Sequence, residues 1–290
     1  MITGSIVALV TPMTSAGAID KKGLATLIEY HIQAGTAALG IAGTTGESAT
    51  LTMGEHIDVI QFVVEQAAGR IPVVAGTGSN STHEAIELTV AAAAAGAEYS
   101  LLVTPYYNKP PQEGLYRHFC QVAAAVNIPI ILYNVPSRTG VDLSNETVLR
   151  LSEVGNIAGL KDATGDVERG RDLISKLPDT FAVYSGDDAT ALDLMSAGGR
   201  GNVSVTANIA ASKVAEVCRL AIAGDYTGAQ KINAELSALN DALFIEANPI
   251  PVKWAMVELG MISDGIRLPL VAMSSAHQDT VLKAIRQAGL

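Results

Sequence analysis

The feature that most constrains the fold of this chain is a repeated unit of about 30 residues, the length of a strand followed by a helix. In each unit a short apolar run is followed by an amphipathic stretch with helical spacing, such as Leu24, Leu27 and Ile28. The eight apolar runs are Ile6–Val10, Ala37–Ala42, Pro72–Ala75, Tyr99–Thr104, Pro129–Asn134, Ile157–Asp162, Phe181–Ser185 and Asn202–Thr206. Eight such units predict an α/β protein of the (β/α)₈ TIM barrel class.

Composition agrees with strands that are buried on both faces. Hydrophobic residues make up 49% of the 290 residues, whereas aromatic residues make up only 4% and charged residues 17%. The length suits one barrel with a helical addition. We therefore predict a barrel over residues 1–224 and a C-terminal helical extension, packed on it, over 225–290. The helices expected after the last strand are Ser212–Ala223, Tyr226–Phe244, Pro251–Leu259 and His277–Ala288.

Charge and cysteine content exclude several classes of function. The formal net charge is −10 and no basic patch is visible, which argues against binding to nucleic acid. Cys120 and Cys218 fit neither a metal site nor a disulfide framework, so we expect a reducing compartment. The start, Met1–Ser5, lacks a signal-peptide pattern, and the most apolar helical stretch, Val90–Ala95, is too short to cross a membrane. These features predict a cytoplasmic protein without a membrane partner.

One charged residue interrupts an otherwise apolar strand. Lys161 lies within Ile157–Thr164, and lysine is rarely buried because its ammonium loses several kcal/mol of hydration in an apolar site. A buried lysine escapes this cost by releasing its proton, and a neutral amine can form a Schiff base with a ketone. The window alone also allows a second interpretation, in which Lys161 ends an edge strand and extends its ammonium into water.

Other reactive side chains also follow predicted strands, where barrel enzymes carry their chemistry. These residues are Thr44, Thr45, Tyr133 and Arg138. Each has a structural alternative. Thr44 and Glu47 have the spacing of a helix capping box, Tyr133 fits a core aromatic, and Arg138 fits an ordinary loop cation. Their common placement at strand ends nevertheless predicts that they converge with Lys161 on one pocket.

Several segments resemble the dihydrodipicolinate synthase family. They are Gly43-Thr44-Thr45-Gly46-Glu47, Tyr133-Asn134-Val135-Pro136-Ser137-Arg138-Thr139-Gly140 and the strand of Lys161. The similarity covers essentially the whole chain, from Gly4–Pro12 through Val103–Asn108 to Asn248–Trp254. The Thr-Thr-Gly-Glu and Tyr-Asn-x-Pro elements within these segments also occur in the wider pyruvate-dependent lyase and aldolase superfamily, and Arg138 is the more discriminating residue.

The resemblance implies a condensation of pyruvate with L-aspartate 4-semialdehyde that gives 4-hydroxy-tetrahydrodipicolinate, the first committed step of diaminopimelate and lysine biosynthesis. Lys161 would form an iminium with pyruvate, and Tyr133 would move protons. A phenol alone is a weak base near neutral pH, so the family relays protons through the residues that match Thr44 and Tyr107. In the family the residue that matches Tyr107 enters the site of a neighbouring subunit.

The resemblance also implies how the substrates are held. Thr45 and the backbone near Val203 would bind the pyruvate carboxylate, and Gly186 is a further substrate-binding position. Arg138 would offer a bidentate fork to the carboxylate of the second substrate. No metal and no organic cofactor is implied, and the expected assembly is a homo-oligomer, a dimer of dimers.

Two other functions compete with the synthase. A related lyase, acting on N-acetylneuraminate or a 2-keto-3-deoxy sugar acid, would use the same Lys161 and Tyr133. It would not be expected to carry arginine at position 138 or glycine at position 186. A catalytically inactive barrel that serves as a binding protein would be expected to lack Lys161, Tyr133 or the relay.

Regulation by L-lysine is a further implication of the resemblance, since many relatives bind it between paired subunits. The matching positions are Ser48, Ala49, His56, Asn80, Glu84 and Tyr106. Glu84 also fits a capping box with Ser81, as Glu55 does with Thr52. Position 53 is often polar in lysine-sensitive relatives but is Met53 here, and a thioether is a weak acceptor. We therefore expect weakened or altered inhibition by lysine.

Overall fold

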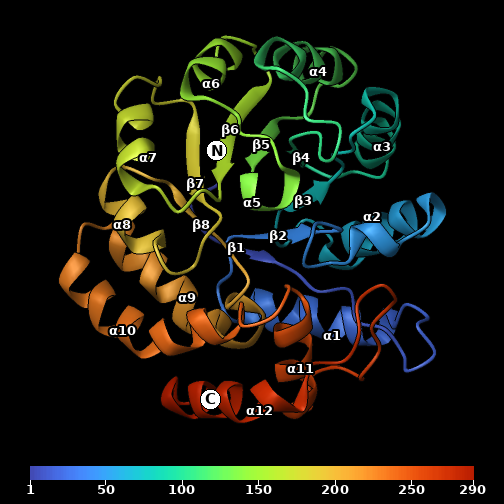
Figure 1. Ribbon diagram of the computed structural model, residues 1–290, viewed down its shortest axis with the longest axis vertical. Helices are drawn as coiled ribbons and strands as arrows, with labels where there is room; N and C mark the ends of the chain where they lie inside the picture. The colour runs from blue at the N-terminus through green and yellow to red at the C-terminus, as the bar shows by residue number, and fades with distance from the viewer.

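Eight parallel strands close into a barrel in sequence order, and the last strand pairs with the first (Figure 1). This is seen in a computed structural model that describes all residues from 1 to 290. The strands are β1 Gly4–Ala8, β2 Ala38–Ile41, β3 Val73–Gly76, β4 Tyr99–Val103, β5 Ile130–Asn134, β6 Ile157–Asp162, β7 Ala182–Ser185 and β8 Gly201–Ser204. The predicted barrel class is confirmed.

The first strand shows where the sequence pattern misplaced a boundary. β1 covers Gly4–Ala8 rather than the predicted Ile6–Val10. Its first two residues, Gly4 and Ser5, pair with β8 although neither is a strong strand former. The apolar pattern continues past the strand because Val10 is buried above the barrel, where its N–H donates to Asn208 Oδ1.

The strands are apolar on both faces because each face meets a hydrophobic layer. Inward-facing side chains such as Ile6, Val74 and Val203 fill the barrel interior. Outward-facing side chains such as Val7 and Leu39 pack against the surrounding helices. This double burial explains why the strands appear in the sequence as continuous apolar runs.

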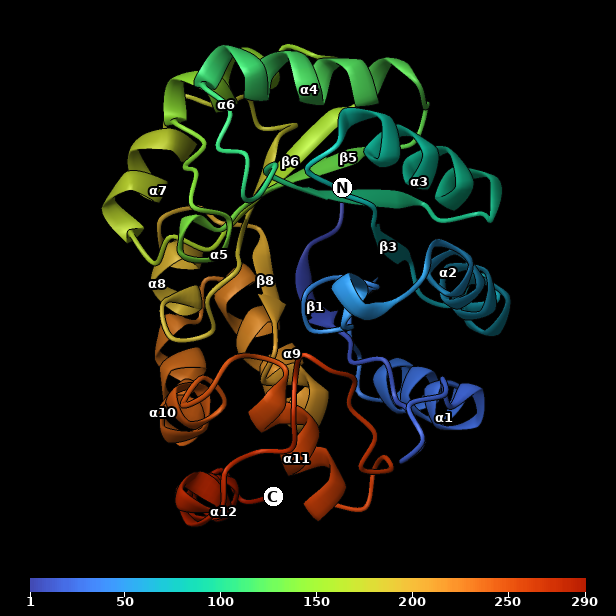
Figure 2. The same ribbon diagram turned by 45° about the vertical axis from the view of Figure 1, so that its right-hand side comes forward.

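Helices surround the barrel and alternate with its strands (Figures 1 and 2). They are α1 Lys21–Gln33, α2 Met53–Ala67, α3 Thr82–Ala94, α4 Gln112–Ala124, α5 Pro136–Thr139, α6 Asn145–Leu151, α7 Val167–Ile174, α8 Ala191–Ser196 and α9 Ala207–Ile222, with a 3₁₀ turn, η1, at Ser48–Thr50. The capping box at Thr52 and Glu55 is confirmed, since each side chain accepts from the other residue's N–H.

The second predicted capping box is only half formed. Ser81 Oγ accepts from the N–H of Glu84, as expected at a helix start. The Glu84 carboxylate does not accept from the N–H of Ser81. It accepts instead from Ser79 Oγ at 2.7 Å, because the preceding loop brings that hydroxyl within reach.

Three further helices follow the barrel, namely α10 Tyr226–Ala242, α11 Ile250–Glu258 and α12 Ser275–Gln287. They lie together beside α9, at the lower edge of both views, where α10 and α11 contact α9 (Figures 1 and 2). Their buried side chains belong to the same hydrophobic cluster as residues of α1 and α2. The division at residues 224 and 225 therefore stays a prediction. None of the helices is both long and apolar enough to span a lipid bilayer.

Candidate active site

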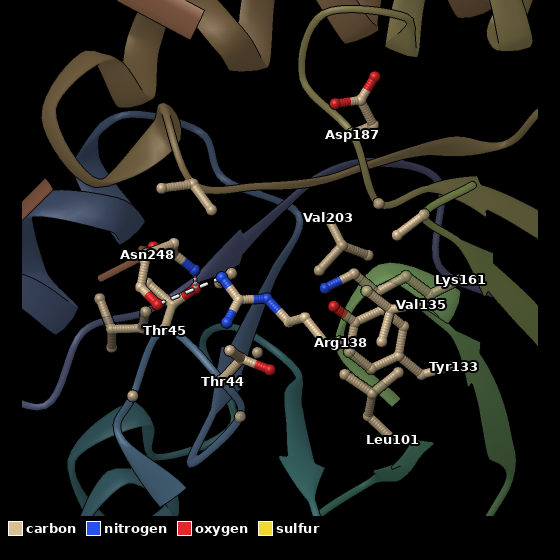
Figure 3. Close-up of a pocket in the computed structure, with 18 of the residues that line it drawn as sticks. Thr44, Thr45, Leu101, Tyr133, Val135, Arg138, Lys161, Asp187, Val203 and Asn248 are labelled. Atoms are coloured by element: carbon tan, nitrogen blue, oxygen red, sulfur yellow. Dashed lines mark hydrogen bonds between the residues drawn. The ribbon is translucent and has the colours of Figure 1, made fainter. Parts of the chain in front are cut away.

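A cavity of about 230 Å³ opens at the carboxyl ends of the strands (Figure 3). Seven of the eight residues predicted for catalysis or substrate binding line it. They are Thr44, Thr45, Tyr133, Arg138, Lys161, Gly186 and Val203. The strand-end rule thus brings side chains from five separate strands or their loops to one place, as the barrel geometry requires.

Lys161 lies in the middle of the sheet, since β6 pairs with β5 on one side and with β7 on the other. The interpretation that places it on an edge strand is therefore wrong. Its side chain is 6% exposed and takes part in no ion pair. Its Nζ lies 4.0 Å from the centre of the Tyr133 ring, which is the neighbouring residue in register on β5. The amine is therefore held in the cavity without a carboxylate to bind it.

Gly186, at the end of β7, makes room for this lysine. A Cβ at position 186 would lie 2.8 Å from Lys161 Cε and 2.8 Å from the Cβ of Ala163. Both distances are shorter than ordinary contacts between carbon atoms. The structure therefore gives Gly186 a steric reason to be glycine, in addition to its place in the lining of the cavity.

Arg138 is the second basic residue of the cavity, and it reaches across the mouth from α5 (Figure 3). Its Nη2 donates to the backbone carbonyl of Asn248 at 3.3 Å, and Asn248 Nδ2 donates to Thr45 Oγ1 at 3.0 Å (Figure 3). Arg138 has no ion-pair partner either. Asp187 also lines the cavity, but its carboxylate points away and accepts from the N–H and hydroxyl of Thr190. An acidic chain has thus placed two basic side chains without a carboxylate partner in one cavity, which favours anionic substrates.

Tyr107 is the one predicted catalytic residue that does not reach the cavity of its own chain. Its side chain is 87% exposed, and its backbone has a φ of 73°, which is uncommon for a residue other than glycine. The N–H of Tyr107 donates to the carbonyl of Thr139. The tyrosine is therefore presented outward from the barrel rather than toward Lys161.

The alternative interpretation of Thr44 and Glu47 as a capping box is wrong, because no helix begins at Thr44. Glu47 is buried, and its carboxylate accepts from Lys253 Nζ and from the N–H of Arg267. Sequence reasoning missed this contact and missed Asn248. One signal for Lys253 was available, because it lies in a helix that is apolar apart from its last residue, Glu258, as Lys161 lies in an apolar strand.

The six positions proposed for lysine regulation lie outside the cavity. They fall on the segments that follow β2, β3 and β4, and they are Ser48, Ala49, His56, Asn80, Glu84 and Tyr106. His56 is buried and its Nε2 lies 2.7 Å from the carbonyl oxygen of Gly76, while burial lowers the pKa of its imidazole. Tyr106 is 40% exposed, and the carbonyl of Asn80 accepts from the side chain of Asn108.

Comparison with known proteins identifies the family. The model of the dihydrodipicolinate synthetase family matches residues 1–288. The chain belongs to this family. It is 57% identical, over 100% of its own length and 99% of the relative, to 4-hydroxy-tetrahydrodipicolinate synthase of Stutzerimonas stutzeri. As a member of this family, the protein is an enzyme, and the interpretation as an inactive binding barrel is not supported.

Solved structures of the family agree with the fold. The dihydrodipicolinate synthase of Acinetobacter baumannii, described as chloride inhibited and complexed with pyruvate, has a TM-score of 0.98 and 55% identity, covering 100% of this chain and 99% of that one. The enzyme of Cyanidioschyzon merolae, solved with lysine bound, has a TM-score of 0.96 and 39% identity, covering 100% and 99%. Membership in the family favours the synthase over a sugar-acid lyase.

Proposed function

We propose that the protein is a 4-hydroxy-tetrahydrodipicolinate synthase, which condenses pyruvate with L-aspartate 4-semialdehyde in diaminopimelate and lysine biosynthesis. The observation that carries this proposal is the unpaired amine of Lys161, 4.0 Å from the ring of Tyr133 and in the same cavity as the unpaired Arg138. The identity of 57% over the full length to a synthase supports the same reaction.

The first half of the reaction uses Lys161 as a nucleophile. The amine nitrogen attacks the ketone carbon of pyruvate, the ketone oxygen leaves as water, and an iminium forms. The positive nitrogen withdraws electrons, so a proton leaves the methyl carbon and an enamine results.

Tyr133 is proposed to carry the protons of these steps. Its hydroxyl and the Lys161 amine point toward the same part of the cavity (Figure 3). Thr44 lines the cavity and makes no side-chain hydrogen bond, so its hydroxyl is available for a relay. The outward position of Tyr107 supports a relay that is completed by a second subunit, and a homo-oligomer is part of this proposal.

In the second half the enamine carbon attacks the aldehyde of L-aspartate 4-semialdehyde. The amine of that substrate then attacks the iminium carbon, displaces Lys161 and closes the ring. Thr45 and the backbone near Val203 are proposed to hold the pyruvate carboxylate, and Arg138 the carboxylate of the second substrate. One donor of Arg138 is occupied by Asn248, and the remaining donors of its guanidinium are available for this carboxylate.

A substrate panel tests the proposal. The purified protein is assayed for condensation of pyruvate with L-aspartate 4-semialdehyde, and separately for pyruvate release from N-acetylneuraminate and from a 2-keto-3-deoxy sugar acid. We expect condensation to have the highest kcat/KM by a wide margin. Faster cleavage of either sugar acid would contradict the proposal and support the related lyase.

We also propose weakened inhibition by L-lysine, as expected from Met53. This residue begins α2 and is 42% exposed, where its thioether offers only a weak acceptor. The lysine-bound relative from Cyanidioschyzon merolae supports a lysine site within the family. A dose–response curve that shows complete inhibition at low lysine concentration would contradict this expectation. The cytoplasmic location and the dimer-of-dimers assembly remain predictions.

A further inference from the structure

The loop that carries Thr44 and Thr45 is a tight turn between β2 and η1. The N–H of Glu47 donates to the carbonyl of Thr44 at 3.1 Å, and the N–H of Ser48 donates to the carbonyl of Gly43 at 3.2 Å. Glu47 itself has a φ of 57°, a left-handed conformation that is unfavourable for glutamate. The turn therefore needs contacts from elsewhere in the fold to hold it.

Lys253 of α11, which does not line the cavity, supplies those contacts. Its Nζ donates to the carboxylate of Glu47 and, at 3.2 Å, to the backbone carbonyl of Thr11. Thr11 Oγ1 in turn donates to the carbonyl of Gly46 at 2.7 Å. The lysine thus connects the loops that follow β1 and β2, and both members of the ion pair are buried, with side chains 4% and 0% exposed.

The second carboxylate oxygen of Glu47 accepts from the N–H of Arg267 at 3.2 Å. Arg267 lies beyond α11, so two separate points of the C-terminal segment hold the same carboxylate. Neither Glu47 nor Lys253 lines the cavity. Because desolvation offsets most of its attraction, a buried ion pair contributes little net stability, and its use at a strained turn points to control of geometry.

We propose that Glu47 and Lys253 are positioning residues that hold the hydroxyls of Thr44 and Thr45 in place for the reaction. This inference rests on the proposed function and deepens it, since the C-terminal helices act on a step at Lys161 without touching substrate. The two threonines depend on the pair to different degrees. Thr45 Oγ1 is also held by Asn248, whereas Thr44 makes no side-chain hydrogen bond and takes its position from the turn alone.

The test removes both charges at once, so that no unpaired charge stays buried. The double variant Glu47→Gln/Lys253→Met keeps the approximate shape of both side chains and is expected to fold. Subunits with a working Lys161 are counted by borohydride reduction in the presence of pyruvate, and kcat is expressed per trapped site. We expect this kcat to fall about 100-fold, the scale of a misplacement of about 1 Å, with a much smaller change in KM for pyruvate.

The chain offers a matched control. Lys213 Nζ donates to the carboxylate of Glu235 at 2.6 Å and to the carbonyl of Ala288, so it makes the same two kinds of bond as Lys253. It joins α9 to α10 and to the end of α12, and it does not line the cavity. The variant Lys213→Met/Glu235→Gln should leave kcat per trapped site unchanged.

An equal kcat per trapped site in the double variant and the control would overturn the proposal and leave the pair a purely structural contact. If the double variant does not fold, Glu47→Asp replaces it, because it keeps the charge and shortens the link by one methylene. A folded Glu47→Asp enzyme with unchanged kcat per trapped site would overturn the proposal equally. Failure of the wild-type protein to trap pyruvate on Lys161 would contradict the proposed function instead, so the two failures are distinguishable.

Discussion

The two buried lysines of this protein are placed in opposite surroundings. Lys161 is 6% exposed and Lys253 is 3% exposed, so burial does not separate them. Lys253 meets the carboxylate of Glu47, which partly offsets the lowering of the Lys253 pKa by burial. Lys161 has no carboxylate partner and faces an open cavity beside Tyr133. The presence or absence of a partner, rather than burial, distinguishes the structural lysine from the reactive one.

Replacement of the reactive lysine should have the largest effect on catalysis. In Lys161→Ala we expect the rate of condensation to fall on the order of 10⁴- to 10⁶-fold, the scale seen when a covalent nucleophile is removed. The fold should persist, because no partner of Lys161 is left unpaired. Steady-state kinetics and circular dichroism check both parts. Substantial residual turnover in a preparation free of wild-type protein would contradict the assignment.

Replacement of Lys253 should have a larger effect than replacement of Lys161 when the free energy of unfolding, rather than the rate, is measured. Lys253→Met leaves the buried carboxylate of Glu47 without its cation, so the free energy of unfolding should fall by about 3–5 kcal/mol. Lys161→Met removes a polar group that has no partner and should change this free energy by less than about 1 kcal/mol, or raise it. Denaturant unfolding of the two variants side by side makes the comparison. Greater destabilisation by Lys161→Met would contradict it.

Arg138 extends the comparison to the second basic side chain of the cavity that has no carboxylate partner. If it binds the carboxylate of L-aspartate 4-semialdehyde, Arg138→Ala loses a charged hydrogen bond of about 1.5–3 kcal/mol. The KM for this substrate should then rise about 10- to 100-fold. Trapping of pyruvate on Lys161 should not change. A small loss of activity with aspartate semialdehyde would show that the assignment of Arg138 as a carboxylate clamp is wrong.

The smallest effect is expected at the partly exposed ion pair beside the buried one. Arg267 and a backbone N–H of Thr52 lower the pKa of Glu55 from 4.5 to about 2. Because the folded pKa lies below the unfolded one, this stabilisation is complete above about pH 4.5 and is lost as the pH falls toward 2. Solvent screens the pair, so Glu55→Gln should cost only about 0.2–1 kcal/mol at neutral pH. Thermal unfolding from pH 7 to pH 3 should show a smaller loss for the variant than for the wild type, and equal losses would contradict the prediction.

Much of the fold was predictable because its signals are local. Strands buried on both faces appear as apolar runs, and this pattern placed all eight strands with small errors, as at β1. The rule that barrel chemistry lies at strand ends placed Thr44, Tyr133 and Arg138 beside Lys161 without any contact information.

The contacts that the sequence did not predict are non-local. Glu47 and Lys253 are 206 residues apart in sequence, and they meet only because α11 docks against the loops that follow β1 and β2. The spacing of Thr44 and Glu47 instead suggested that Glu47 was a capping residue, since a local motif is easier to recognise than a docking contact. The outward position of Tyr107 is non-local in a further sense, because its proposed partner belongs to a second subunit.

The difference between the two lysines can be tested in one reaction. The protein is reduced with borohydride in the presence of pyruvate, digested, and mapped by peptide mass spectrometry. We predict one adduct per subunit, on the peptide that contains Lys161, and none on the peptide that contains Lys253. An adduct on any other lysine, or no adduct at all, would contradict the assignment of Lys161 as the Schiff-base lysine.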